Sequence, residues 1–252
     1  MSGKGEPFVQ EIISLHTSGN FKGILNLIQD VYEASSQDKA KIHLLHLISW
    51  PTPTEKDLSC LAAAIFSLKV SHIHSIGCGT GLLEWLLSKY LLKHYLEANT
   101  DYERKIEVTG IEADFRWWTS SYSPPQFIPL QFVGKDFAKE NPFAEFDDMV
   151  MFCYCNSVAL FRTYVGAFLG TYVLIIGPLS STSYELICES ENFDEDLNGV
   201  DLPETFNLPK ANWKLILLKR FGLVKTDHVA VYKRIEKAFE PPRRKINGAR
   251  TH

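Results

Sequence analysis

Short apolar runs alternate with helical patterns over most of this chain, and this alternation limits the possible folds more than any other feature. Helical spacing of apolar residues separates several of the runs, most clearly over 82–97. Continuous apolar strands interleaved with helices are typical of a parallel sheet that helices cover on both faces. Five runs are expected to be strands of this kind: 72–76 (HIHSI), 106–112 (IEVTGIE), 128–133 (IPLQFV), 148–153 (DMVMFC) and 171–177 (TYVLIIG).

Two further strand candidates near the C-terminus have a different connection. Residues 213–219 (WKLILLK) and 228–234 (HVAVYKR) lie close together, with Gly222 between them. So short a link joins antiparallel strands, because a parallel pair needs a crossover of about a dozen residues or more. The sequence therefore predicts an α/β fold with a seven-stranded, mostly parallel sheet, helices on both faces and a C-terminal antiparallel hairpin.

The region before the first strand is expected to be helical. Apolar residues recur at helical spacing over 8–48, with breaks at 18–20 and 35–36. We expect an N-terminal helical extension over 1–49. It either covers one face of the domain that follows or presents a surface to a protein partner.

The boundaries of the main domain follow from caps and composition. Thr54 and Asp57 have the spacing of a capping box and predict a helix over 55–68. The last residues are basic and poor in apolar side chains, which is typical of disorder. We expect a main domain over 50–235 and a basic disordered tail over 236–252.

Composition points to an intracellular location. The net charge of −4 gives no overall attraction to nucleic acid or to an anionic membrane. No stretch approaches the about 20 apolar residues of a membrane span, and the N-terminus lacks the apolar core of a secretory signal. The five cysteines lack the paired spacing of a zinc site and are expected to be reduced and mostly buried. We expect a cytoplasmic protein, with the nucleus as the alternative, and no metal or membrane partner.

Residues 74–87 (HSIGCGTGLLEWLL) contain the clearest functional signal. Gly77, Gly79 and Gly81 alternate between a predicted strand and a predicted helix. At such a place, bare backbone lets a ligand approach the main chain and face a helix N-terminus. The alternative is that the glycines only permit close packing of the helix on the strand. The dinucleotide fingerprint G-x-G-x-x-G does not fit, because position 82 is Leu.

The stretch HIHSIGCGTG resembles motif I of the class I S-adenosylmethionine-dependent methyltransferases, whose fold has the same seven strands and terminal hairpin. The resemblance implies S-adenosyl-L-methionine as cofactor. It also implies that the cofactor contacts the residues of motif I: Ser75, Gly77, Cys78, Gly79 and Gly81.

Further segments extend the resemblance over about 48–235, including Trp50-Pro51-Thr52, which an uncharacterised subgroup carries before motif I. Glu112 ends the second predicted strand, where the family binds both ribose hydroxyls with a carboxylate. A solvated strand end is the alternative for Glu112. Asp136 and Phe137 resemble the adenine-binding pair, and Cys153 lies in the stretch that resembles motif IV, beside the sulfonium.

Two departures from the family bear on activity. Ser75 stands where the family usually places Asp or Glu beside the methionine ammonium. Losing such a charge-assisted bond costs on the order of 1–3 kcal/mol of affinity. Residues 153–157 (CYCNS) lack the Asn/Asp-Pro-Pro-Tyr signature of amino-group methyltransferases. We expect methyl transfer to an unknown acceptor; the alternative is an inactive methyltransferase-like protein that binds a partner.

Several other residues have more than one interpretation. His72 and His74 are expected to pack or bond locally rather than to catalyse. The pair at 117–118 (WW) either lines an adenine pocket or divides between core and rim. Tyr154 either packs in the core or faces the cationic sulfonium. The side chains at 153 and 155, both Cys, are expected on one face of a strand. No catalytic residue is assigned, because methyl transfer can rest on alignment and desolvation alone.

Overall fold

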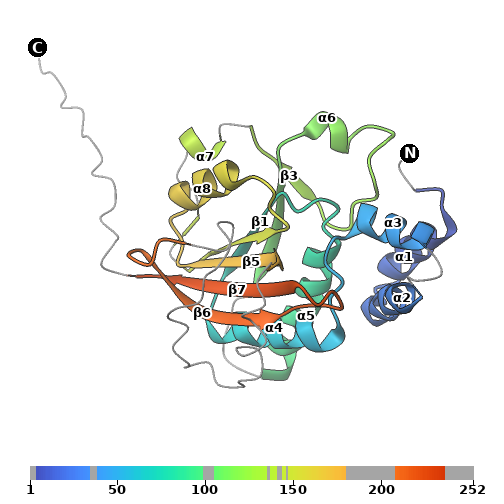
Figure 1. Cartoon of the computed structure of the whole chain (residues 1–252), viewed down its shortest axis with the longest axis horizontal. Coiled ribbons are helices and arrows are strands. Elements are labelled where there is room, and N and C mark those ends of the chain that lie inside the picture. Colours follow the sequence, from blue (N-terminus) through green and yellow to red (C-terminus); the bar gives the residue numbers. More distant parts are fainter. Residues whose placement is uncertain are drawn as a thin grey trace, which may run out of the picture.

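A computed structural model describes residues 4–34, 39–98, 105–134, 137–140, 144–145, 147–179 and 208–235. Within these ranges seven strands form one sheet in the order β3-β2-β1-β4-β5-β7-β6 (Figure 1). The strands are β1 (His72–Ile76), β2 (Glu107–Glu112), β3 (Leu130–Phe132), β4 (Met149–Cys153), β5 (Tyr172–Pro178), β6 (Trp213–Arg220) and β7 (Asp227–Arg234). Strands β1 to β5 pair in parallel, and β7 runs antiparallel to both β5 and β6. The predicted fold class is confirmed, including the terminal hairpin.

The helices of the described ranges agree with most of the predicted pattern. They are α1 (Pro7–Thr17), α2 (Phe21–Glu33), α3 (Lys39–Ile48), α4 (Glu55–Ser67), α5 (Leu82–Ala98), α6 (Phe115–Trp118), α7 (Phe137–Glu140) and α8 (Val158–Ala167). The capping box that starts α4 is present, with Thr54 and Asp57 bonded to each other's backbone N–H. None of these helices is long and apolar enough to span a membrane.

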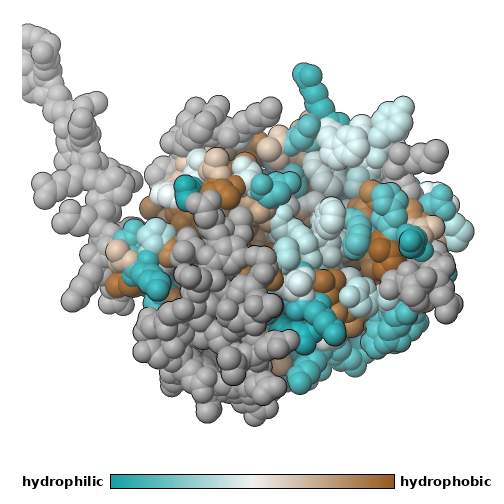
Figure 2. Space-filling model, viewed as in Figure 1, coloured by the Kyte–Doolittle hydropathy of each residue, from teal (hydrophilic) through white to brown (hydrophobic). Residues whose placement is uncertain are grey.

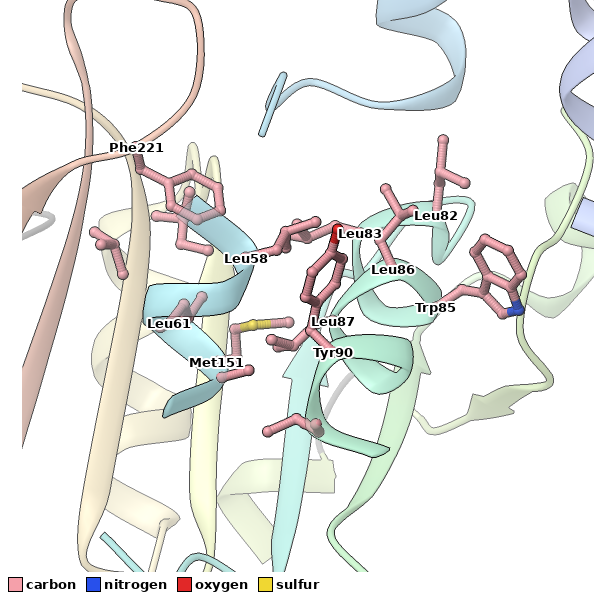
Figure 3. Packing of buried hydrophobic residues seen from close by; sticks show 14 of the residues in the cluster. Leu58, Leu61, Leu82, Leu83, Trp85, Leu86, Leu87, Tyr90, Met151 and Phe221 are labelled. Carbon is pink, nitrogen blue, oxygen red and sulfur yellow. The ribbon is translucent and has the colours of Figure 1, made fainter. Parts of the chain in front are cut away.

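Alternating side chains of the central strands divide the core into two clusters. Met149 and Met151 of β4 face the cluster that contains α4 and α5, whereas Val150 and Phe152 face the cluster that contains α8. Figure 3 shows the first cluster from close by, with leucines of α4 and α5 packed around Met151. Both faces of the sheet are covered, which explains the continuous apolar runs in the sequence.

The N-terminal helices belong to the first of these clusters. Residues from α1, α2 and α3 pack into the same apolar core as α5, β1 and β5. His16 accounts for two of the contacts: its Nε2 lies 2.8 Å from the carbonyl oxygen of Phe127, and its ring lies 4.6 Å from that of Trp85. These contacts place α1–α3 beside the first turns of α5 (Figure 1). On the face shown in Figure 2, the described surface mixes hydrophilic residues with separate apolar patches.

Candidate functional site

The glycine stretch lies where the strand order of the sheet reverses. From β1 the chain builds outward to β2 and β3, then returns to add β4 and β5 on the other side. Open α/β sheets bind ligands outside the carboxyl ends of the strands at such a point. Ile76 and Phe152 pair in register, so Gly77 and Cys153 follow at the neighbouring ends of β1 and β4. The sheet therefore presents the glycine turn at a position suited to a ligand.

The three glycines have different surroundings. All three have positive φ, with +66° at Gly77, +64° at Gly79 and +75° at Gly81, a conformation that glycine adopts readily. A Cβ atom at Gly77 or Gly79 would meet no described atom within 4 Å. At Gly81 it would lie 2.3 Å from Cγ1 of Ile128. Gly77 and Gly79 thus border open space, whereas Gly81 permits close packing.

Glu112 is tied to the glycine turn. The Gly79 N–H donates to Oε1 of Glu112 at 2.7 Å, and the Trp118 side chain also hydrogen-bonds the carboxylate. Burial raises the pKa of Glu112 above its usual range, although these hydrogen bonds oppose the shift. The carboxylate of Glu112, at the end of β2, is therefore held against the backbone of the glycine turn.

Ser75 faces a residue that the sequence interpretation overlooked, Glu84 in the first turn of α5. The Ser75 hydroxyl donates to Oε1 of Glu84 at 2.6 Å, and the two residues are 0% and 1% exposed. The other oxygen, Oε2, is buried without a hydrogen-bond partner among the described residues. Burial raises the pKa of Glu84 to about 7. One signal was available in the sequence: a lone acid in the apolar run LLEWLL.

The charges at this end of β1 are unbalanced. Glu84 and Glu112 raise the pKa of neighbouring groups, and Glu112 contributes to the raised pKa of Glu84. None of the described groups that shift the pKa of either carboxyl is a cation. A positively charged ligand would restore the balance.

The cysteines near the turn are unreactive thiols. Cys78 lies against β2, since a Cβ atom at Gly110 would come within 2.5 Å of its Sγ. Burial raises the pKa of the thiols of Cys78, Cys153 and Cys155. A fourth described thiol, Cys60, is exposed, so the cysteines are less buried than expected. These groups remain protonated near neutral pH and do not provide nucleophiles.

The prediction that Cys153 and Cys155 share a strand face was wrong. Cys153 packs against the cluster of α4 and α5, and Cys155 against the cluster of α8. The strand ends at Cys153, and Tyr154 has a φ of +52°. This left-handed residue turns the chain, so the alternation of a strand no longer applies.

Tyr154, Trp50 and His46 form a stack of rings beside the end of β4. The Tyr154 hydroxyl donates to Oδ2 of Asp227 at 2.5 Å, and its ring stacks on Trp50 with centroids 5.8 Å apart. Trp50 is 58% exposed and also stacks on His46. Asp227 is buried, which raises the pKa of its carboxyl, and its Oδ1 has no described partner. Burial and the contact with Asp227 raise the pKa of Tyr154, so the phenol keeps its proton.

The remaining predicted residues lie near the carboxyl ends of β2 and β3. Phe137 begins α7 and donates its backbone N–H to the Gly134 carbonyl at 3.0 Å. Asp136 lies outside the described residues. Trp118 is buried and Trp117 is exposed, which confirms the division between core and rim.

Comparisons with known proteins show likeness of fold alone. No protein-family model matches the chain, and no curated protein matches its sequence. The 16S rRNA methylase RmtB aligns over 91% of this chain and 75% of its own, with 12% identity and a TM-score of 0.44. An O-methyltransferase from Bacillus cereus in complex with SAH aligns over 90% of this chain and 91% of its own, with 10% identity and a TM-score of 0.43.

These likenesses are too distant to assign an activity or a ligand. The description of the fold rests instead on the sheet itself, with its strand order and its antiparallel end. The chain has a seven-stranded Rossmann-like fold, closed by the antiparallel β6–β7 hairpin.

Proposed function

We propose that this chain binds S-adenosylmethionine at the glycine turn and transfers its methyl group to an acceptor. The observation that supports this most directly is the open space over Gly77 and Gly79 at the reversal point of the sheet. A ligand can approach the main chain there without meeting a side chain. The carboxylate of Glu112, bonded to Gly79, is suited to accept hydrogen bonds from the two ribose hydroxyls.

The buried carboxylates fit the charge of this cofactor. S-adenosylmethionine carries an ammonium, a sulfonium and one carboxylate, so its net charge is positive. The site has two carboxyl groups with raised pKa and no described cation beside them. Oε2 of Glu84 lacks a partner, so we propose it as the acceptor for the ammonium. Glu84 then supplies the charge that the family places at the position of Ser75. On this proposal, Ser75 in place of the usual Asp or Glu does not weaken the site.

The acceptor is proposed to approach from the end of β4. When bound, the cofactor supplies an electrophilic methyl group. Tyr154 and Trp50 offer aromatic faces there, and aromatic faces attract cations such as a sulfonium. Tyr154 keeps its proton and is held by Asp227. We therefore propose that it orients the cofactor and the acceptor and does not act as a base. Alignment and exclusion of water are then the main contributions of the protein.

The test is calorimetry with S-adenosylmethionine and S-adenosylhomocysteine on the wild type and on Gly79→Ala. The added methyl group projects into the space proposed for the ligand. We expect affinity to fall about 10–100-fold, since crowding of this kind costs about 1–3 kcal/mol.

Gly19→Ala is the matched control. Gly19 also has a positive φ, +72°, and open space around its Cβ position, but it lies in the turn between α1 and α2. Both variants should lose about 1–2 kcal/mol of stability from backbone strain, and only Gly79→Ala should lose affinity. Wild-type protein that binds neither compound would contradict the proposal and support the alternative of an inactive, partner-binding protein. Binding that is equal in both variants would place the ligand elsewhere.

A further inference from the structure

Two histidines and an aspartate meet at the amino ends of the central strands β1 and β4, opposite the end that carries the glycine turn. His72 begins β1 and His74 follows on the same face, while Asp148 directly precedes β4. One candidate ligand atom from each of the three lies within 4.8 Å of the others. The Nε2 atom of His74 is 3.0 Å from Oδ2 of Asp148, and the two imidazole rings stack with centroids 4.1 Å apart.

These separations suit a small divalent ion. Zn²⁺ bonds to histidine nitrogen and carboxylate oxygen are about 2.0–2.2 Å long, so neighbouring ligands of a tetrahedral ion stand roughly 3.3 Å apart. The three side chains need only small movements to reach that geometry. Two imidazoles and one carboxylate are a common donor set for Zn²⁺, with a water molecule in the fourth position.

Neighbouring groups hold the candidate ligands in place. The Nε2 atom of His72 lies 2.7 Å from the hydroxyl of Thr109 on β2. The hydroxyl of Ser71 donates to Oδ1 of Asp148 at 3.1 Å, and the Glu145 N–H donates to its Oδ2 at 2.8 Å. Metal ligands in proteins are usually oriented by such outer partners. The local bonds expected for His72 and His74 are present, and the bond to Thr109 orients the His72 ring.

The cluster lies at a largely buried position. Asp148 is 5% exposed. The His74 side chain is 15% exposed, so the cluster is partly open to solvent.

We propose that His72, His74 and Asp148 bind a zinc ion that joins the amino ends of β1 and β4. This site shares no residue with the glycine turn and does not depend on the proposed methyl transfer. Because the ion would link two central strands, binding would stabilise the folded chain.

The experiment uses the full chain freed of metal by a chelator and titrated with Zn²⁺ in a calorimeter. We expect binding of one ion per chain, together with a rise in melting temperature. Asp148→Asn keeps the shape of the side chain but is a poorer ligand, and His74→Ala removes a ligand. Each should weaken binding by at least about 100-fold, because loss of an outer partner alone commonly costs about 10–100-fold.

Two further variants separate a built site from adventitious binding. Thr109→Val removes only the outer partner of His72 and should weaken binding by about 10–100-fold. His43→Ala removes an exposed histidine on α3 and should leave affinity unchanged. Circular dichroism establishes that each variant is folded.

Co²⁺ in place of Zn²⁺ identifies the ligands by absorption. Nitrogen and oxygen ligands give d–d bands without the near-ultraviolet thiolate charge-transfer band. A strong thiolate band would show binding at cysteines, among which Cys60 is exposed, and would overturn the proposal. Wild-type protein that binds no Zn²⁺, or affinity that Asp148→Asn and His74→Ala leave unchanged, would overturn it as well.

Discussion

The buried carboxyl group of Glu84 makes stability depend on pH. Its pKa is about 7 in the folded chain, against 4.5 for the ordinary group. Below about pH 4.5 the group is protonated in both states and has no effect. As pH rises from about 4.5 to 7, the unfolded chain releases the proton that the folded chain still holds, so stability falls. Above about pH 7 the loss is complete, on the order of 3 kcal/mol.

Glu84→Gln tests this effect, because the amide keeps the shape and can bond Ser75 without a charge. We expect the free energy of unfolding of the variant, relative to wild type, to rise by about 2.5 kcal/mol between pH 5 and pH 8. Urea unfolding at both pH values without ligand provides the measurement. Leu96→Ala, at an exposed position on the same helix, is the control and should give the same difference from wild type at both pH values. Parallel pH curves for wild type and Glu84→Gln would show that the carboxyl is not desolvated.

The sequence predicted part of the site at the level of single residues. The positions of Gly77, Gly79 and Glu112 at strand ends followed from local pattern, and the structure joins Gly79 to Glu112 through one hydrogen bond. The sequence could not predict that Ser75 lies against Glu84, because that contact depends on how α5 packs over β1. It also could not predict the left-handed φ of Tyr154, because the residue there is not a glycine.

At the scale of elements, Asp57 connects the start of α4 to the terminal hairpin. Its Oδ2 accepts from the N–H of Thr54 at 2.9 Å, from the Thr54 hydroxyl at 2.6 Å and from the N–H of Gly222 at 3.0 Å. Asp57→Ala should therefore cost more than loss of a simple cap, about 2–3 kcal/mol, since it also leaves the Gly222 N–H without this partner.

Asn20→Ala provides the comparison, because Asn20 caps α2 with a single bond to the Gly23 N–H. Loss of such a cap costs about 1 kcal/mol. Urea unfolding of both variants measures the difference. Equal costs for the two would mean that the link from Asp57 to the hairpin contributes nothing to stability.

Long elements were easier to predict than short ones. The apolar runs predicted all seven strands of the described sheet, and the capping box predicted the first residue of α4. The helices α6 and α7 have four residues each, too few for a helical period to stand out. The strand predicted over 128–133 is shorter, at Leu130–Phe132. Ile128 packs its side chain against Gly81, and the pairing with β2 begins at Leu130.

At the scale of the whole molecule, the shared apolar cluster indicates that the N-terminal helices fold together with the sheet. Ile28 of α2 and Val231 of β7 are both fully buried members of that cluster. The sequence placed a boundary near residue 49, because periodicity shows each amphipathic helix but not its packing partner. A core that crosses this boundary predicts one cooperative transition for both regions.

Ile28→Ala tests this cooperativity in the full chain. The smaller side chain leaves a cavity and should lower the free energy of unfolding by about 2–5 kcal/mol. If the core is shared, hydrogen exchange should show the same loss of protection at amides of α2 and at amides of β7, in the opposite half of the chain. Leu96→Ala, at a position 68% exposed on α5, should change neither. Loss of protection confined to α1–α3, with β7 unchanged, would contradict a single unit and show that the helices are a separately folding extension.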